Sequence, residues 1–229
     1  MKVIDISNVN KIYNDSEVKV HAVNSVSLSF EEGEFAAIVG PSGSGKTTLL
    51  NILGGLDNPT TGKIIIGGIN IGELRPSKLI DFRMRNIGFV FQAYNLIPVL
   101  TARENVEFIM HLQGRSKNER EKRTRELLNS VGLGDRLDSK PGKLSGGQQQ
   151  RVAVARALAS KPKFILADEP TANLDSKSAE TLLNIMEKLN KEENITFIFS
   201  THDARVVKKA RRVITLEDGK VLNDNIVTI

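Results

Sequence analysis

Cysteine and tryptophan are absent from the 229 residues, and aromatic side chains make up only 5% of them. Without cysteine the chain can form no disulfide, no thiol nucleophile and no cysteine-ligated metal site. The scarcity of aromatic side chains disfavours a surface on which nucleic-acid bases stack. The missing disulfides fit a reducing compartment, so we expect a cytoplasmic protein.

Long hydrophobic runs are missing as well. The longest apolar stretches, such as residues 35–39 and 195–199, have the length of a strand rather than of a membrane-spanning helix. The opening residues carry Asp5 and Asn8 where a secretory signal needs an apolar block. We therefore expect a chain that is not exported and does not cross a membrane by itself.

Charge of either sign is moderate. The chain has 32 basic and 27 acidic residues, a net charge of +5, and its densest basic group, Lys208, Lys209, Arg211 and Arg212, is short. Such an excess serves ordinary solubility, and we expect no nucleic-acid partner. With 40% hydrophobic and 26% charged residues, the composition is that of a globular protein long enough to bury a core.

Hydrophobic patterning predicts an α/β fold. Residues 26–30 alternate apolar with polar side chains, which is typical of a half-buried strand, whereas residues 35–39 are continuously apolar, as in a strand covered on both faces. Residues 101–158 are highly charged and helical in pattern. Strand-like and helix-like segments alternate from residue 164 onward and end in a hairpin that turns at residues 218–219.

A phosphate-binding loop follows the apolar segment 35–39. Residues 40–48 read GPSGSGKTT and contain the pattern G-x-x-x-x-G-K-[ST] between a predicted strand and a predicted helix. Glycines let the backbone N–H groups turn inward around an anion, and the amino terminus of the helix adds a positive dipole. Lys46 supplies a point charge for the β- and γ-phosphates, and the Thr47 hydroxyl is a ligand of the kind that Mg²⁺ takes. The predicted nucleotide-binding residues are Gly40, Pro41, Ser42, Gly43, Ser44, Gly45, Lys46, Thr47 and Thr48.

Two carboxylates end another predicted strand. Residues 164–169 read FILADE, so Asp168 and Glu169 stand at the carboxyl edge, where open α/β sheets bind ligands. Beside a phosphate loop, Asp168 is suited to the Mg²⁺ shell, and Glu169 is suited to orienting or deprotonating an attacking water. The pair therefore predicts hydrolysis of the terminal phosphate of a bound nucleotide.

A second glycine-rich helix start lies at residues 144–151, LSGGQQQR. Its N–H groups predict another anion site, although a Ser-Gly-Gly sequence taken alone is commonly only a helix cap. With this motif in place, the chain resembles the ATP-binding subunits of ABC transporters over essentially its whole length. LSGGQ resembles the signature motif of that family, and GPSGSGKTT and ILADEP stand in the family's order.

The resemblance implies further site residues. Tyr13 resembles the aromatic residue that stacks on adenine, and Gln92 resembles the Q-loop glutamine that contacts Mg²⁺ and links to the membrane subunit. Asp175 lies in a stretch similar to the D-loop, and His202 resembles the switch histidine at the γ-phosphate. Catalysis is thereby assigned to Lys46, Gln92, Glu169 and His202. Contacts to ATP from the opposite subunit are assigned to Ser145, Gly146, Gly147 and Gln148.

The resemblance also implies the fold and the assembly. We expect a single ABC ATPase domain, with an α/β P-loop core and mixed sheet plus an antiparallel β subdomain at residues 1–98 and 159–229, and an inserted helical subdomain at about 99–158. In the family, each ATP lies between the phosphate loop of one subunit and the signature motif of the other. Because this chain carries one full set of motifs, we expect a head-to-tail homodimer that forms with ATP and uses Mg²⁺.

Within the family, the stretch GFVFQAYNLIPVLTARENV resembles the lipoprotein-releasing, macrolide-export and cell-division ATPases. This resemblance implies separate permease subunits, a location on the inner face of the cell membrane, and export or extraction of a lipoprotein, peptide or drug-like substrate. Two alternatives stay open. One is an importer ATPase of the amino-acid type, and the other is a cell-envelope or soluble ABC ATPase that transports nothing.

Overall fold

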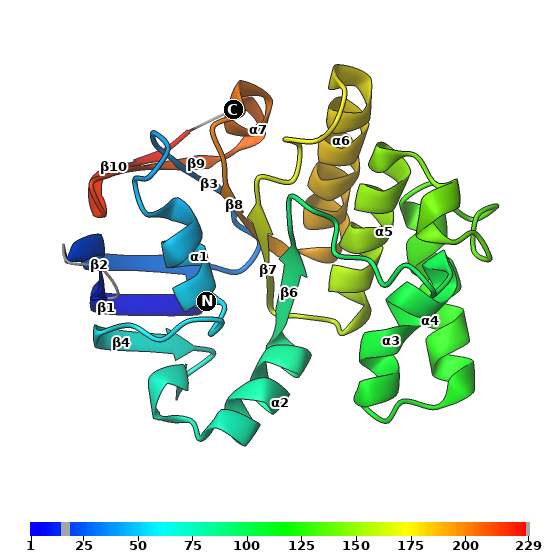
Figure 1. Ribbon diagram of the computed structural model, residues 1–229, viewed down its shortest axis with the longest axis horizontal. Helices are drawn as coiled ribbons and strands as arrows, with labels where there is room; N and C mark the ends of the chain where they lie inside the picture. The colour runs from blue at the N-terminus through cyan, green and yellow to red at the C-terminus, as the bar shows by residue number, and fades with distance from the viewer. Residues whose placement is uncertain (15–18, 228–229) are drawn as a thin grey trace.

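A six-stranded sheet forms the centre of the molecule, in the order β10-β9-β3-β8-β7-β6 (Figure 1). The computed structural model describes residues 1–14 and 19–227. Five of these strands run parallel, and β10 is antiparallel at one edge, so the parallel strands all end at the same edge of the sheet. The strands are β3 (Phe35–Val39), β6 (Ile87–Val90), β7 (Phe164–Asp168), β8 (Thr196–Ser200), β9 (Arg212–Glu217) and β10 (Lys220–Ile226).

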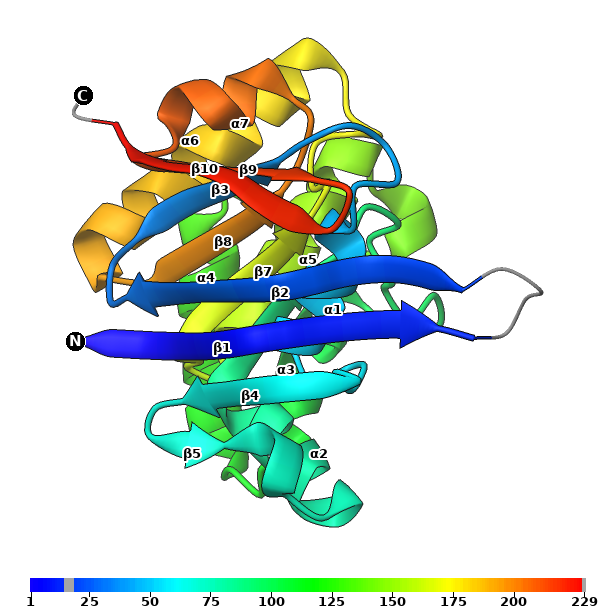
Figure 2. The same ribbon diagram turned by 90° about the vertical axis from the view of Figure 1, so that its left-hand side faces the viewer.

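A second, antiparallel sheet has the order β2-β1-β4-β5 and lies across one side of the first (Figure 2). Its strands are β1 (Lys2–Tyr13), β2 (Val20–Glu31), β4 (Thr61–Ile66) and β5 (Ile69–Asn70). In β2 the predicted alternation is confirmed, because Val26, Leu28 and Phe30 are buried while Ser27 is exposed. The predicted mixed sheet and antiparallel β region are therefore both present.

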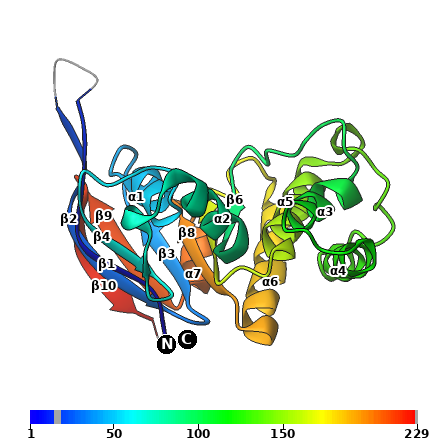
Figure 3. The same ribbon diagram turned by 90° about the horizontal axis from the view of Figure 1, so that it is seen from below.

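Seven α-helices surround the sheets in the described part of the chain. α3, α4 and α5 gather beside the six-stranded sheet, away from the antiparallel one, which confirms the helical pattern predicted for residues 101–158 (Figure 3). Within residues 1–14 and 19–227, no helix combines the length and the apolar character needed to cross a membrane. The helices are α1 (Lys46–Leu53), α2 (Pro76–Asn86), α3 (Ala102–Leu112), α4 (Lys117–Ser130), α5 (Gly146–Ala159), α6 (Ser176–Glu193) and α7 (Ala204–Lys209), with 3₁₀ turns at Ile71–Glu73 and Pro141–Lys143.

The six-stranded sheet separates two hydrophobic cores. Phe35 and Ala37 of β3 belong to the core shared with α3, α5 and α6, whereas Ala36 and Ile38 belong to the core shared with α1 and the antiparallel sheet. Successive side chains of a strand point to opposite faces, so a strand between two cores must be apolar at every position. This is why residues 35–39 read as a continuous hydrophobic run.

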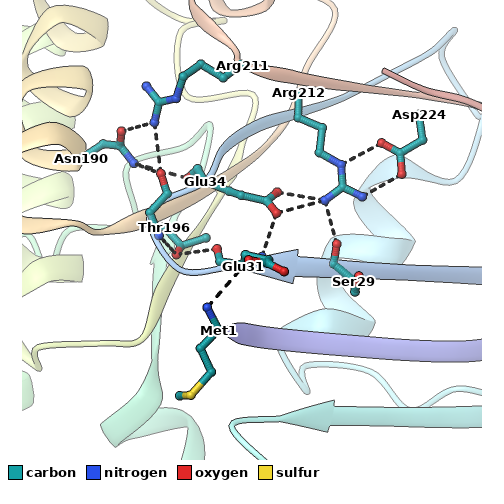
Figure 4. A network of polar contacts seen from close by, with 10 residues as sticks. Met1, Ser29, Glu31, Glu34, Asn190, Thr196, Arg211, Arg212 and Asp224 are labelled. Atoms are coloured by element: carbon teal, nitrogen blue, oxygen red, sulfur yellow. Dashed lines mark hydrogen bonds and ion pairs between the residues drawn. The ribbon is translucent and has the colours of Figure 1, made fainter. Parts of the chain in front are cut away.

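The amino edge of the sheet is closed by a network around Arg212, at the start of β9 (Figure 4). The guanidinium of Arg212 donates to Glu34 Oε2 at 2.9 Å, to Asp224 Oδ2 at 2.7 Å and to the carbonyl of Ser29 at 2.7 Å. The hydrogen bonds to Asp224, together with those to Glu34, hold the pKa of Arg212 well above its ordinary value. The network joins both sheets, because Ser29 lies in β2 and Asp224 in β10.

Asn190 of α6 continues this network beside Arg212 (Figure 4). Its buried amide nitrogen donates to the carbonyls of Gly33 at 2.9 Å and Ile195 at 2.6 Å, and its oxygen accepts from Arg211. Of the four residues in the short basic group, Arg211 and Arg212 make structural contacts in this network, and Lys209 bonds Glu187 of α6.

Candidate active site

A cavity of about 980 Å³ opens at the carboxyl edge of the six-stranded sheet, next to the antiparallel sheet. It brings together predicted site residues that are far apart in the sequence. Those that line it are Tyr13, Gly40, Pro41, Ser42, Gly43, Ser44, Gly45, Lys46, Thr47, Thr48, Gln92, Glu169 and His202. The phosphate loop, the end of β7 and the end of β8 thus face a common space.

The phosphate loop needs its glycines because neighbouring backbone comes very close. A Cβ atom on Gly40 would lie 2.0 Å from the carbonyl oxygen of Leu216, and one on Gly45 would lie 2.0 Å from that of Ala22. Gly45 also has φ of 96°, in the left-handed region that side chains disfavour, and it directly precedes α1. The loop therefore begins the helix with its N–H groups free to point at an anion.

Lys46 and Ser44 carry polar atoms suited to phosphate oxygens. Lys46 as a whole is only 8% exposed, and its ammonium donates to the carbonyls of Gly40 at 2.9 Å and Pro41 at 2.8 Å, with no carboxylate at ion-pair distance among the described residues. The hydroxyl of Ser44 is buried and has no hydrogen-bond partner. A buried hydroxyl and a cation without a counter-ion are both costly unless an anion accepts from them, so the loop fits a nucleotide phosphate.

The end of β7 places a carboxylate against the phosphate loop. Thr47 Oγ1 donates to Asp168 Oδ1 at 3.1 Å. The described residues contain no cluster of three or more His, Asp or Glu side chains that could hold a metal by themselves. A hydroxyl and one carboxylate fit Mg²⁺, which takes few protein ligands and completes its shell with phosphate oxygens and water.

Glu169 lies at a sharp turn after β7 and is held by β8. Its φ of 45° is in the left-handed region, and its N–H donates to the carbonyl of Ser200 at 2.9 Å. The carboxylate accepts from Thr201 Oγ1 at 3.2 Å and lies 2.6 Å from His202 Nδ1. Since a carboxylate only accepts, His202 carries its proton on Nδ1 and directs Nε2 elsewhere. The strained backbone aims the carboxylate into the cavity.

Tyr13, at the end of β1, lines the cavity from the antiparallel sheet. Its hydroxyl donates to Asp57 Oδ2 at 2.8 Å, and the ammonium of Lys11 lies 4.9 Å from the ring centroid while bonding Asp57 Oδ1 at 2.6 Å. Burial and the bond to Asp57 raise the pKa of Tyr13. Burial alone would raise the pKa of Asp57, but the bonds from Lys11 and Tyr13 lower it. These contacts hold the Tyr13 ring in a fixed orientation.

The LSGGQ residues lie outside this cavity in the same chain. Ser145 and Gln148 form a reciprocal capping box at the start of α5, with Gln148 N donating to Ser145 Oγ at 3.2 Å and Ser145 N to Gln148 Oε1 at 2.8 Å. Gly146 and Gly147 allow close packing, since their Cβ atoms would lie 2.7 Å from Tyr94 Oη and 2.8 Å from Ser178. The helix cap and the predicted anion site thus coincide at an exposed helix end.

Asp175 also lies outside the cavity. It caps α6 by accepting from the N–H of Ser178 at 2.9 Å and from its hydroxyl at 2.6 Å, and these bonds lower the pKa of Asp175. The sequence reasoning missed Val20, His21, Ala22 and Asp218, which line the cavity. The sequence predicted a hairpin turn at Asp218 but not its place in the cavity, where the adjoining Gly219 donates its N–H to the carbonyl of Ser44 at 3.1 Å.

Residues 23–172 match the family model described as ABC transporter. The chain belongs to the ABC transporter family. An uncharacterized ABC transporter ATP-binding protein of Thermotoga maritima is 51% identical over 220 residues, which cover 96% of this chain and 94% of that protein. The macrolide export ATP-binding/permease protein MacB of Hyphomonas neptunium is 49% identical over 222 residues, which cover 97% of this chain but 34% of that longer protein. This ABC transporter chain thus spans about a third of that MacB's length.

Solved structures of a related ABC cassette share the whole fold. The dimeric post-hydrolysis state of the ATP-binding cassette MJ0796, bound to ADP and Pi, superposes with a TM-score of 0.90 at 45% identity and covers 99% of both chains. A second dimeric structure of MJ0796, a protein of Methanocaldococcus jannaschii, also gives a TM-score of 0.90. These comparisons confirm the predicted ABC ATPase fold, and the chain is an ATP-binding subunit and ATPase of this family.

Proposed function

We propose that two copies of this chain bind two ATP molecules head to tail and hydrolyse them to drive a separate membrane permease. The observation that carries the proposal is the division of the motifs between two places. The phosphate loop, Gln92, Glu169 and His202 share one cavity, whereas residues 145–148 lie outside it. A second copy can supply the missing motif, and the related MJ0796 cassette is described as dimeric.

The proposed chemistry is phosphoryl transfer to water by positioning and charge stabilisation. Lys46 and the loop N–H groups bind the β- and γ-phosphates, and Tyr13 stacks on the adenine. Thr47, Asp168 and Gln92 would hold Mg²⁺, which neutralises charge on the phosphate oxygens. The carbonyl contacts of Lys46 and the bond from Thr47 to Asp168 support the phosphate and Mg²⁺ roles, and the roles of Tyr13 and Gln92 rest on the family resemblance and on their place in the cavity.

Glu169 is the proposed residue for the attacking water. It is already held by Thr201 and His202, so its carboxylate enters the reaction oriented. His202 would bear on the γ-phosphate through Nε2, which must carry a proton to donate to a phosphate oxygen while Nδ1 donates to Glu169. Ser145 and Gly147 of the second copy, together with Asp175, would close the site around the triphosphate.

The decisive experiment replaces Glu169 by glutamine. We expect Glu169→Gln to lower the rate of ATP hydrolysis by about 10³-fold, because water loses its base, while ATP binding is retained. The variant should accumulate as an ATP-bound dimer, which size-exclusion chromatography with and without ATP measures. Near-normal hydrolysis by this variant would contradict the assigned role of Glu169.

Ser145→Arg tests the two-chain site. Because residue 145 is exposed and remote from the cavity of its own chain, the variant should bind ATP as a monomer with unchanged affinity. It should fail to dimerise and to hydrolyse ATP, since the arginine blocks the phosphates of the opposite site. Loss of ATP binding by the monomer would show that the site lies within one chain.

An exposed apolar surface supports the permease partner. Large hydrophobic side chains are exposed to solvent on three segments. Ile80 of α2 is 62% exposed, Val99 of the loop between β6 and α3 is 70% exposed, and Leu112 of α3 is 54% exposed. Gln113 Nε2 donates to the carbonyl of Met84 at 3.0 Å, which brings the ends of α2 and α3 together. Val99 lies in the segment between Gln92 and α3, and exposed apolar side chains of this kind fit a protein partner. A membrane protein co-purifying in mild detergent would identify it.

Export or extraction is the proposed direction of transport. It rests on the relatives named macrolide export ATP-binding/permease protein, which include those of Hyphomonas neptunium and Aggregatibacter actinomycetemcomitans. The permease recovered with the chain tests this. A permease with a large extracytoplasmic domain supports export or extraction, and a solute-binding protein in the same assembly supports import.

A further inference from the structure

Gln150 joins two segments of the active site through one amide group. It lies in the second turn of α5 and is fully buried. Its Nε2 donates to the carbonyl of Phe91 at 3.1 Å and to the carbonyl of Pro170 at 2.8 Å. Phe91 immediately precedes Gln92, and Pro170 immediately follows Glu169. A single side chain therefore bonds the backbone next to both residues.

The loop after Gln92 is held by other side chains in the same way. Arg156, also on α5, donates to the carbonyls of Tyr94 at 2.8 Å and of Asn95. Asn173 Nδ2 donates to the carbonyl of Gln92 at 3.0 Å. Tyr94 and Asn95 have φ of 43° and 50°, so these bonds maintain a left-handed backbone that the residues would otherwise leave.

Local stability does not explain a glutamine at position 150. Its Oε1 is buried without a hydrogen-bond partner. An unpartnered buried acceptor costs free energy, and an apolar side chain of the same length would avoid that cost. Asn190, in contrast, is a buried amide whose oxygen accepts from Arg211 and whose nitrogen also bonds carbonyls. The Gln150 amide therefore uses only its nitrogen, which bonds the carbonyls of Phe91 and Pro170, and leaves its oxygen without a partner.

α5 connects the two ends of this arrangement. It begins at the exposed LSGGQ motif and lies between the six-stranded sheet and α3 and α4 (Figure 1). Gly146 and Gln150 are four residues apart, which is about 6 Å along a helix. Any tilt of α5 at its amino terminus is therefore transmitted to the carbonyls of Phe91 and Pro170 in the same chain.

We propose that Gln150 is a positioning residue that holds the segments carrying Gln92 and Glu169 in register with each other and with the helix that begins at the signature motif. The proposal rests on the proposed function, in which the amino terminus of α5 bears on the nucleotide of the opposite subunit. Closure of one composite site would then reach the catalytic carboxylate of the other through Gln150.

The test is Gln150→Met in the full chain, with Asn190→Leu as the matched control at the other edge of the sheet. We expect Gln150→Met to lower kcat on the order of 10- to 100-fold, because Glu169 and Gln92 lose their common support, with the KM for ATP and the monomer's Kd changed less than about twofold. Asn190→Leu should lower the denaturant midpoint and leave kcat unchanged. Unchanged kcat in Gln150→Met, or a parallel loss of ATP affinity, overturns the proposal.

Amide hydrogen exchange supplies a readout that does not depend on turnover. In Gln150→Met, exchange should quicken in peptides covering residues 92–95 and 171–174 while β3 and β8 keep their protection. Uniformly faster exchange would mean a general structural role and would overturn the positioning role. If the Gln150→Met variant does not fold, both measurements are repeated with Gln150→Leu, which has a shorter side chain. Failure of the wild-type chain to hydrolyse ATP would instead reject the proposed function.

Discussion

The two edges of the six-stranded sheet use similar polar residues with opposite results. At the amino edge, Arg212 bonds two carboxylates and a carbonyl, and Asn190 uses both its oxygen and its nitrogen. At the carboxyl edge, Ser44 and Gln150 keep a buried polar atom without a partner, and Glu169 has a strained backbone. A saturated network stabilises the fold, whereas the unpartnered Ser44 hydroxyl and the strained backbone at Glu169 remain available to a ligand.

The largest expected effect comes from removing Arg212 from the saturated network at the amino edge. Arg212→Met should lower the free energy of unfolding by about 3 kcal/mol, because Glu34 and Asp224 lose the cation that pairs them in a partly buried site. The affinity for ATP should not change, since the substitution lies at the edge opposite the cavity. Chemical denaturation and a nucleotide-binding titration measure the two quantities. Weakened ATP binding by a folded Arg212→Met would refute the separation of the two edges.

Lys46→Met should give the reverse result at the carboxyl edge. Removing the ammonium deletes a charge-assisted contact to phosphate worth about 2 kcal/mol, so the Kd for ATP should rise about 30-fold. The free energy of unfolding should stay the same or increase, because Lys46 is buried with only carbonyl partners. A clear drop in the free energy of unfolding without ATP would contradict this and would show that Lys46 stabilises the fold.

The smallest expected effect concerns the acid stability contributed by Glu187. Its carboxylate accepts from Lys191 and from Lys209, both at 2.7 Å, and these bonds lower its pKa from 4.5 to about 2. A lowered folded-state pKa stabilises the protein above the unfolded value, and this stabilisation is lost as the pH falls from 4.5 toward 2. Since the side chain is 25% exposed, we expect about 1 kcal/mol or less.

Glu187→Gln measures this contribution. The variant should be less stable than the wild type at neutral pH, and the difference should close as the pH approaches 2, in urea unfolding followed across that range. ATP hydrolysis at neutral pH should be unaffected, because Glu187 does not line the cavity. A difference that persists at the acid end would assign the loss to packing rather than to charge.

Local signals in the sequence predicted the carboxyl edge better than the amino edge. The phosphate loop and the end of β7 each combine glycine or acidic residues with the end of a hydrophobic run, and α5 begins with a glycine-rich motif, so their chemistry could be predicted from a few neighbouring residues. Gln92 and His202 carry no such local pattern and were identified by resemblance only. Asp218 was predicted to lie in a turn, yet its place in the cavity depends on how β9 and β10 pack beside the phosphate loop.

The amino edge could not be predicted because its partners are distant in the chain. Arg212 belongs to a basic group that the sequence alone predicts to be solvated, and its partners Ser29 and Glu34 lie about 180 residues earlier.

Gln150, at the carboxyl edge, could not be singled out from the sequence either, because it is one of three consecutive glutamines in a motif. Only the tertiary arrangement selects the one that reaches Phe91 and Pro170. Contacts of this kind have no periodicity that a single sequence could display.

The close approach of both sheets to the phosphate loop has a mechanical consequence. Ala22 of the antiparallel sheet and Leu216 of the six-stranded sheet press on the loop at Gly45 and Gly40. Tyr13 belongs to the same antiparallel sheet as Ala22. In the proposed function, the base and the triphosphate of one nucleotide would therefore rest on a common support. Because both sheets hold the loop closely, we expect the motion that follows cleavage of the γ-phosphate to occur mainly on the side where α3, α4 and α5 lie.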